Sequence, residues 1–215
     1  MAGLVESWLS AFTFLLKLDR TRAPGPAPTY GSAHVLLALL TIGEAGVLGR
    51  HALSSEVGLG EGAARTVIKW LKADGYITIE ANGCTLSAKG KRAYNELKKL
   101  MPKMLVLTRT TLTVGKVQVA VLVKKRSGRV KSGIEQRDSS IKAGASGATT
   151  YLVKDSRFEV PGSSRDAEKD FPAEAWKKLK EGLEPEDGDV VIVCGSDEKH
   201  TSLIGVISAV LTLLD

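Results

Sequence analysis

Four polar side chains close together in the sequence have the types and spacing needed to bind a nucleic acid. If residues 61–75 form a helix, Arg65 and Lys69 lie one turn apart on it, and Lys72 follows with Thr66 alongside. An arginine can form two hydrogen bonds with the edge of a guanine, whereas lysines more often contact phosphates. We therefore expect Arg65 to read a base and the two lysines to hold the DNA backbone.

A turn and a hairpin are expected to position this helix. A first helix is expected within residues 50–60, and Gly58 stands where the chain must turn sharply between it and the helix 61–75. Residues 76–86 then alternate as a short hairpin with its turn at Asn82 and Gly83. The residues expected to pack the two helices together are Leu53, Val57, Leu59, Ala64, Val67, Ile68 and Leu71. This order of elements is typical of a winged helix-turn-helix, which commonly places its second helix in the major groove of DNA.

The neighbours of the basic side chains limit how much DNA sequence the helix can read. Gly62 and Ala63 leave its first turn bare, so it can approach DNA closely but offers few hydrogen bonds there. Asn82 completes the candidate DNA-binding set at the tip of the hairpin. The nearby Glu80 and the lack of Arg or Lys at this tip argue against a firm grip on the minor groove. Some winged helices serve protein contacts instead, and the pattern leaves that alternative open.

Two further helices are expected to flank these elements. Ser32 is placed to cap a helix over residues 33–42, and Ser87 is placed to cap a helix that reaches Met101. We therefore assign the winged helix-turn-helix domain to residues 32–103.

Residues 1–31 form a separate N-terminal part. Residues 3–18 have the apolar spacing of an amphipathic helix, and three prolines make residues 20–28 a linker. The apolar side of the helix can pair with a second subunit or fold back on the core of its own chain. Because dimeric DNA-binding proteins often use a terminal helix in this way, we favour the dimer.

Residues 104–215 are expected to form a second domain in which strands and helices alternate. The expected strands are 104–113, 116–124, 148–154, 157–160 and 190–194, and the expected helices are 132–143, 166–181 and 199–214. The apolar run 190–194 is typical of a strand covered on both faces. In helix 166–181 we expect Phe171, Ala175, Trp176 and Leu179 to be buried. The predicted fold class is α+β, an N-terminal winged helix-turn-helix domain followed by a mixed α/β sheet-and-helix domain.

Gly195 and Ser196 are the first candidate ligand-binding residues of the second domain. They follow the apolar strand and precede the last helix, and a glycine turn at such a place is a common cradle for a small anionic ligand. Asp197 and Glu198 already bring negative charge to this turn and can simply cap the helix. Both interpretations stay open.

Glu135, Arg137 and Asp138 are the second candidate set, next to the Gly-rich stretch 144–150. They could hold a small polar ligand, but we favour an internal salt bridge that locks their helix to the preceding hairpin. Residues 124–131, with five basic side chains in eight, form a cationic loop that suits either phosphates or solvent.

The overall charge of the chain favours an acidic partner. Its 215 residues carry a formal net charge of +6 at pH 7. Residues 104–154 contain ten basic and two acidic side chains, whereas residues 155–215 contain seven basic and fourteen acidic ones. A basic front part joined to an acidic last segment suggests a molecule with one face toward a polyanion.

Other classes of function find little support in the sequence. Cys84 and Cys194 lie far apart, and the three histidines lack metal-ligand spacing, so we expect no metal, no cofactor and no catalytic residue. No stretch approaches the roughly 18 consecutive apolar residues of a membrane helix, and the N-terminus lacks the features of a signal peptide. We therefore expect a cytoplasmic protein without a membrane partner.

Several stretches of the chain resemble an archaeal family of transcriptional-regulator-like proteins that join an N-terminal winged helix to a C-terminal domain of unknown function. The stretches that carry the resemblance are 22–30, 60–66, 83–90, 133–138 with 144–150, and 188–196. The resemblance implies the fold of both domains and a regulatory role. It brings no ligand or catalytic residue with it.

We therefore predict a dimeric, DNA-binding transcriptional regulator whose partner is double-stranded DNA. Its second domain is expected to sense a small ligand or to mediate assembly. Two alternatives from other classes are a nucleotide- or metabolite-binding enzyme with an accessory winged helix, and a protein-interaction adaptor.

Overall fold

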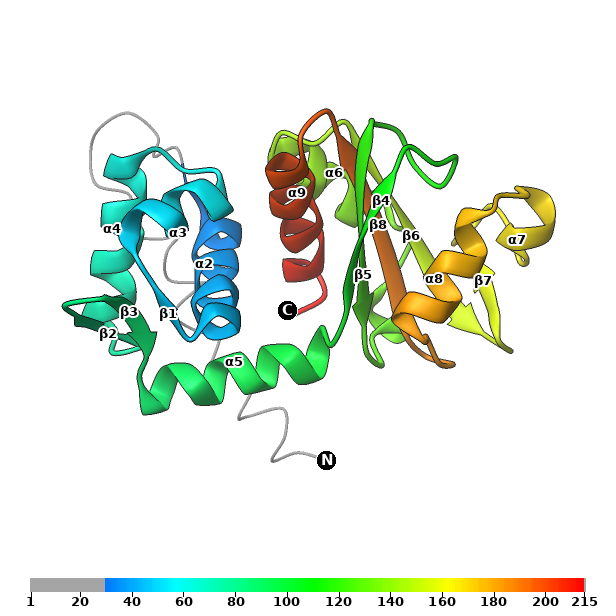
Figure 1. Cartoon of the computed structure of the whole chain (residues 1–215). Helices are drawn as coiled ribbons and strands as arrows, with labels where there is room; N and C mark the ends of the chain where they lie inside the picture. The colour runs from blue at the N-terminus through cyan, green and yellow to red at the C-terminus, as the bar shows by residue number, and fades with distance from the viewer. Residues whose placement is uncertain (1–29, 215) are drawn as a thin grey trace. The chain divides into compact units, whose positions relative to one another are not determined.

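The computed structural model describes residues 30–214, and the chain divides into two compact units, Met1–Leu97 and Lys98–Asp215. The division falls inside one helix, α5 (Ala88–Leu100), whereas we had expected it after residue 103. The predicted helix 3–18 and linker 20–28 lie outside the described residues. Each unit combines helices with its own antiparallel sheet (Figure 1), which confirms the α+β class.

The first unit packs its helices around the apolar residues that the sequence predicts. Its elements in chain order are α2 (Ser32–Ala45), β1 (Val47–Leu48), α3 (Arg50–Val57), α4 (Glu61–Ala73), β2 (Ile77–Glu80), β3 (Gly83–Leu86) and the start of α5. The strands pair in the order β1-β3-β2. All seven residues predicted to join α3 to α4, from Leu53 to Leu71, are buried. Their burial confirms the predicted packing of the two helices.

The start of α2 differs from the prediction. Ser32 is the first residue of the helix rather than its cap, and Gly31 precedes it in an extended conformation. The backbone N–H of Gly31 donates a hydrogen bond of 3.1 Å to Nδ1 of His34. Burial lowers the pKa of His34, which favours the neutral imidazole that can accept this bond. The expected cap by Ser32 is therefore wrong, and the side chain of His34 instead bonds back to the residue that precedes the helix.

The hairpin turn lies one residue earlier than predicted. Ala81 and Asn82 form the turn, and Gly83 already pairs with Glu80 as the first residue of β3. A Cβ atom on Gly83 would lie 2.7 Å from the carbonyl oxygen of Leu48, so glycine is needed there for β1 to pass close by.

The predicted cap of α5 is confirmed. The Ser87 hydroxyl accepts a hydrogen bond of 3.0 Å from the backbone N–H of Gly90.

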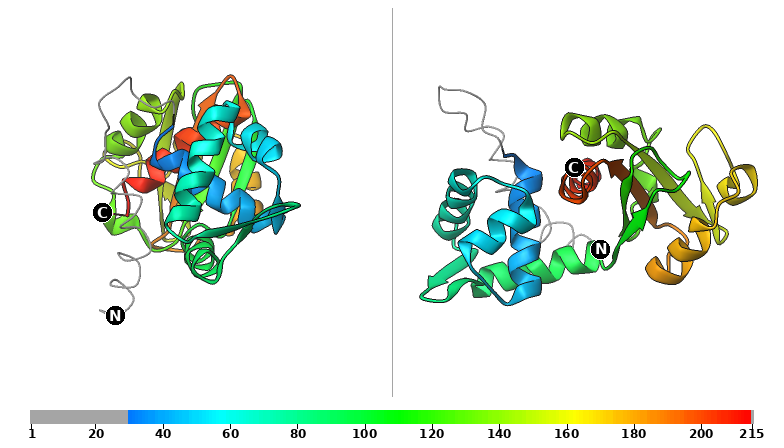
Figure 2. Two further views of the ribbon diagram at one scale, coloured as in Figure 1. Left: turned by 90° about the vertical axis from the view of Figure 1, so that its left-hand side faces the viewer. Right: turned by 45° about the horizontal axis from the view of Figure 1, so that its top comes forward.

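The second unit is a five-stranded antiparallel sheet covered by helices on both faces (Figures 1 and 2). Its elements are β4 (Met104–Thr108), β5 (Val117–Val123), η1 (Ser127–Arg129), α6 (Ile134–Lys142), β6 (Gly147–Lys154), β7 (Arg157–Glu159), α7 (Ala167–Asp170), α8 (Ala175–Leu183), β8 (Val190–Ser196) and α9 (Lys199–Leu211). The strand order is β4-β5-β8-β6-β7. Helices α6 and α9 pack on one face and α8 on the other.

The central strand β8 is buried along its whole length, as the apolar run 190–194 predicts. On the α8 face, the rings of Tyr151, Phe158 and Trp176 pack together, with 5.0 Å between the centroids of Tyr151 and Trp176. Aromatic rings in edge and stacked contact fill a large part of this core.

The predicted helix 166–181 is wrong, because the chain breaks there into α7 and α8. Pro172 disfavours helical backbone at the preceding residue, and Phe171 has φ −131° and ψ 71°. Phe171 is 52% exposed instead of buried, while its carbonyl oxygen accepts a hydrogen bond of 2.9 Å from the indole of Trp176. Ala175, Trp176 and Leu179 are buried as predicted.

The first strand of the second unit is also shorter than predicted. β4 ends at Thr108, and residues 109–116 form a loop before β5. The buried amide of Gln118 donates hydrogen bonds to the carbonyl oxygens of Thr110, Thr113 and Gly115. These bonds hold the backbone of the loop in place. The alternation of apolar residues could not predict them.

Candidate nucleic-acid interface

Helix α4 is held against α3 by a tight turn. Gly58 has a left-handed conformation with φ 70°, which glycine adopts at little cost. The side chain of Ser54 donates a hydrogen bond of 2.5 Å to the carbonyl oxygen of Leu59, and the Leu59 N–H donates one of 3.0 Å back to the Ser54 carbonyl. These reciprocal bonds and the buried residues of α4 set which side of the helix faces outward.

The outward side of α4 carries Arg65, Lys69 and Lys72, and all three are exposed. None of these side chains forms a hydrogen bond or an ion pair with residues 30–214. Three positive charges spaced by four and three residues on one side of a helix repel one another, and contact with a polyanion would reduce this repulsion. We call these three residues the α4 basic stripe.

Two other predicted residues leave the start of the stripe open. Gly62 is exposed, and a Cβ atom placed on it would meet nothing within 4 Å, whereas Ala63 is half-buried. The hydroxyl of Thr66 donates a hydrogen bond of 3.1 Å to the carbonyl oxygen of Gly62 one turn earlier. The Thr66 hydroxyl has therefore used its one donor and can offer a ligand only its two oxygen lone pairs.

Glu61 lies next to the α4 basic stripe and is not among the predicted DNA-binding residues. Its Oε1 atom lies 3.4 Å from Nδ1 of His51 on α3, and both side chains are largely exposed. Its position in the sequence could have indicated a role. An acidic residue in the first turn of a helix that contacts DNA either repels phosphates or accepts a hydrogen bond from cytosine.

The hairpin offers DNA little positive charge. Asn82 is exposed at the turn, beside the exposed Glu80. The nearest basic side chain in the sequence after the hairpin is Lys89, whose Nζ atom donates a hydrogen bond of 2.7 Å to the carbonyl oxygen of Asp74. The same atom lies 4.2 Å from the centre of the Tyr76 ring, so Lys89 closes the end of α4.

Gly195 and Ser196 do not lie in a turn, which corrects our expectation. Both belong to β8 and are buried. A Cβ atom on Gly195 would lie 2.0 Å from the carbonyl oxygen of Val114, so this glycine allows two backbones to approach. The Ser196 hydroxyl lies 2.9 Å from that of Ser202 and accepts a hydrogen bond of 3.1 Å from the N–H of Glu198. This hydroxyl therefore bonds within the protein.

Glu135, Arg137 and Asp138 all lie on α6, but they do not lock it to the hairpin. The guanidinium of Arg137 pairs with its own neighbour Asp138 at 3.0 Å, and both side chains are about half exposed. Glu135 lies 3.3 Å from the hydroxyl of Ser132. No hydrogen bond or ion pair within residues 30–214 connects this set to Ser196. The expected salt bridge between this helix and the hairpin is therefore absent, because Arg137 pairs with the adjacent Asp138 on the same helix.

Two side chains of the predicted cationic loop 124–131 are neutralised within the protein. The buried Asp189 carboxylate accepts hydrogen bonds from the Lys124 ammonium at 2.9 Å and from the Lys125 backbone N–H at 3.0 Å. Burial alone would lower the pKa of Lys124, but hydrogen bonds to Asp189 and Glu186 outweigh it and raise that pKa. The hydrogen bond from Lys124, with that from Lys125, lowers the pKa of Glu186.

The described residues offer no group of side chains for metal chemistry, since no three His, Cys, Asp or Glu side chains converge within 30–214. Burial raises the pKa of Cys194 to about 11, which makes its thiol a poor nucleophile. An open groove of about 610 Å³ lies along α7 and α8, and none of the five candidate ligand-binding residues lines it. Within residues 30–214, no helix is both long enough and apolar enough to cross a membrane.

Comparisons with known proteins show which families the chain is similar to. Residues 37–101 match the family described as CggR N-terminal DNA binding domain, and residues 114–213 match a domain of unknown function, DUF4443. A solved structure, the hypothetical protein PH0730 from Pyrococcus horikoshii OT3, is 30% identical to the chain. The match covers 85% of this chain and 92% of that one, with a TM-score of 0.69. The chain belongs to the same family as that archaeal protein. Comparison with curated proteins gives no significant match.

The two matched families agree with the resemblance that the sequence shows. A DNA-binding domain comes first and a domain of unknown function follows, as in a regulator-like protein. The α4 basic stripe lies inside the matched DNA-binding region.

Proposed function

We propose that this protein is a DNA-binding transcriptional regulator whose first unit is a winged helix-turn-helix. In this proposal α4 enters the major groove, Arg65 forms paired hydrogen bonds with a guanine edge, and Lys69 and Lys72 contact phosphates. The observation that carries the proposal is the α4 basic stripe, whose three charges are exposed and have no partner within residues 30–214. The DNA-binding family that matches residues 37–101 supports it.

The hairpin has a minor role in this proposal. Asn82 is its one candidate contact, and Glu80 beside it disfavours a close approach to phosphates. Specificity is therefore expected to come from α4 and from the shape of the duplex.

The second unit is proposed to mediate assembly or to sense a small ligand, with no catalytic step. Of the two, assembly has the better support, because the hydroxyl of Ser196 and the guanidinium of Arg137 already have partners within the protein.

The test is a binding experiment with random-sequence duplexes followed by sequencing, and then titration of the enriched duplex. We expect Arg65→Ala with Lys69→Ala to weaken binding by roughly 10- to 200-fold, the effect of losing a base contact and a phosphate contact. The matched control is Lys154→Ala with Lys178→Ala, which removes the same charge from exposed positions in the second unit. Equal, strong binding by the wild type and the Arg65/Lys69 variant would reject the proposal.

A further inference from the structure

Helix α6 exposes apolar side chains and buries polar ones, the reverse of an ordinary surface helix. Gln136 and Ser140 are 2% and 0% exposed. Ile134 and Ile141 are 50% and 47% exposed. A helix that lies on a sheet is expected to bury its apolar side, and exposed apolar side chains rimmed by polar ones mark interaction sites.

The polar side of α6 is fastened to α9, so the isoleucines cannot turn inward. The hydroxyl of Ser139 donates a hydrogen bond of 2.8 Å to the carbonyl oxygen of Ser208, and the hydroxyl of Ser140 lies 2.9 Å from the carbonyl oxygen of Gly205. The amide of Gln136 donates a hydrogen bond of 2.6 Å to the hydroxyl of Thr212. These bonds recur along the helix and hold its outer side toward solvent.

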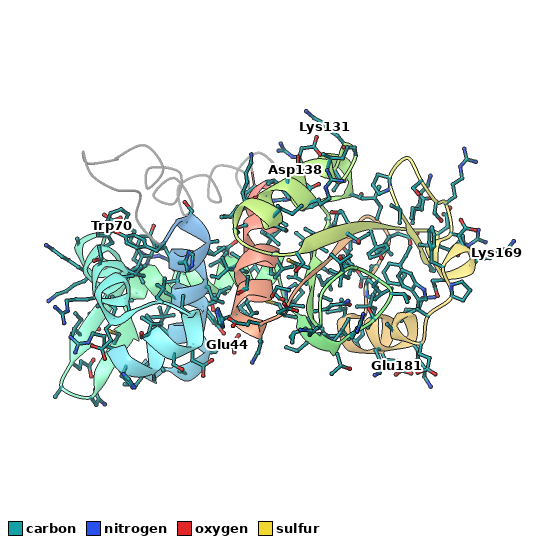
Figure 3. All side chains as sticks on the ribbon, turned by 90° about the horizontal axis from the view of Figure 1, so that it is seen from above. Glu44, Trp70, Lys131, Asp138, Lys169 and Glu181 are labelled. Atoms are coloured by element: carbon teal, nitrogen blue, oxygen red, sulfur yellow. The ribbon has the colours of Figure 1, made fainter. Side chains whose placement is uncertain are left out.

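An ion pair lies between the two isoleucines on the outer side of α6. Ile134 and Ile141 are two helical turns apart, and the Arg137–Asp138 pair at 3.0 Å stands midway between them (Asp138 is labelled in Figure 3). We call these four residues the α6 outer face.

The α6 outer face is complementary to itself. If a second α6 lies antiparallel so that Ile134 faces Ile141 of the other copy, the residues at the centre are fixed by that register. Arg137 then faces Asp138 of the other copy, and Asp138 faces its Arg137. A two-fold interface needs this property, because each residue must suit the partner that symmetry gives it.

We propose that a second copy of this chain packs its α6 antiparallel on the α6 outer face. The nine residues of α6 span about 14 Å, which is short for an interface of about 800 Å² per partner. The pairing is therefore weak by itself. It becomes strong when two copies bind one duplex, because the DNA raises their effective concentration. This last statement rests on the proposed function, but the pairing itself does not.

Charge reversal tests the pairing in the full chain without DNA. Arg137→Asp makes the centre of the face acidic and Asp138→Arg makes it basic, so each variant repels its own copies. We expect sedimentation velocity over a concentration series to show at least a roughly tenfold weaker dimer for each variant. An equimolar mixture of the two variants, and the double variant with both changes, should recover the wild-type dimer. Lys178→Asp on α8 makes the same change of charge as Arg137→Asp at a distant exposed position and should leave the dimer intact.

Two results would overturn this proposal. One is a wild-type chain that stays monomeric up to about 1 mM. The other is a dimer that is indifferent to both single reversals, which would place the interface elsewhere. Neither result depends on DNA, so the pairing and the role of the α4 basic stripe can fail separately.

Discussion

Two pairs of lysines stand in segments of the sequence that are rich in basic residues. One pair is Lys69 and Lys72 on α4, and the other is Lys124 and Lys125 directly after β5. The structure gives them different surroundings. Lys69 and Lys72 have no side-chain partner within residues 30–214, whereas Lys124 pairs with Asp189 and Glu186, and Lys125 with Glu186. A local excess of positive charge therefore does not by itself indicate a surface for a polyanion.

The difference follows from what each segment meets in the fold. The side of α4 opposite to its buried residues lies toward solvent. The end of β5 lies beside the start of β8, and the acidic residues there come from a segment more than sixty positions later in the chain. Strand pairing brings these charges together, and a buried carboxylate needs such partners.

The largest effect is expected on stability, when the carboxylate of Asp189 that pairs with Lys124 is removed. Asp189 is fully buried and accepts hydrogen bonds from Lys124 and from the backbone N–H groups of Lys125 and Glu186. Asp189→Ala should lower the free energy of unfolding of the second unit by about 3 kcal/mol, because these donors lose their acceptor. Urea denaturation followed by circular dichroism measures it. Glu186→Ala, at an exposed partner, is the control, and an equal loss there would contradict the explanation.

The salt dependence of DNA binding should separate the two sets of lysines. Lys69→Ala with Lys72→Ala should reduce the slope of log K against log salt by about 2, since each phosphate contact releases counterions. Lys124→Ala with Lys125→Ala should leave the slope unchanged, measured at a temperature where circular dichroism shows the variant folded. If both variants lost the same slope, the distinction between free and paired charges would not hold.

A smaller effect is expected at the edge of the α4 basic stripe. The Thr66 hydroxyl already donates to the carbonyl oxygen of Gly62, so Thr66→Val should change DNA affinity by less than about threefold. Fluorescence anisotropy with the enriched duplex measures this change. A loss as large as that of Arg65→Ala would show that Thr66 contacts a base directly.

The smallest effect is expected from pH. Hydrogen bonds from Lys124 and Lys125 hold the pKa of Glu186 below its ordinary value of 4.5, so the folded chain binds fewer protons there than the unfolded chain. The contribution of Glu186 is therefore present above pH 4.5 and is lost as the pH falls below it. The wild type should be slightly more stable than Glu186→Gln at neutral pH, and urea midpoints for the two should converge in acid. A gap that widened in acid would reverse the sign.

Local patterns predicted much of the first unit. The spacing of the apolar residues placed α3 and α4, and Gly58 marked the turn between them, because a helix reports its buried side at every third or fourth position. The strand β8 was predicted from its continuous apolar run, which is typical of a strand covered on both faces. The break at Pro172 was a local signal that the apolar spacing across 166–181 concealed.

The role of Gly195 could not be predicted in the same way. A glycine and a serine after an apolar run are typical of a turn, and here β8 continues through both. The glycine is needed because the backbone of Val114, about eighty residues earlier in the chain, lies against Gly195 and leaves no room for a Cβ atom. The unusual orientation of α6 has a similar origin, since bonds to α9 turn its polar side inward.

The sequence by itself determined the described helices except in segment 166–181, and it also determined the central strand, the α+β class and the α4 basic stripe. These depend on the period of side chains along one element, and that period can be read without knowing the partners of the element. Only the tertiary structure decided which charges are neutralised, which glycine serves a close approach and which side of α6 stays exposed. Those properties depend on residues far apart in the chain, and a sequence pattern carries no information on which distant residues the fold brings together.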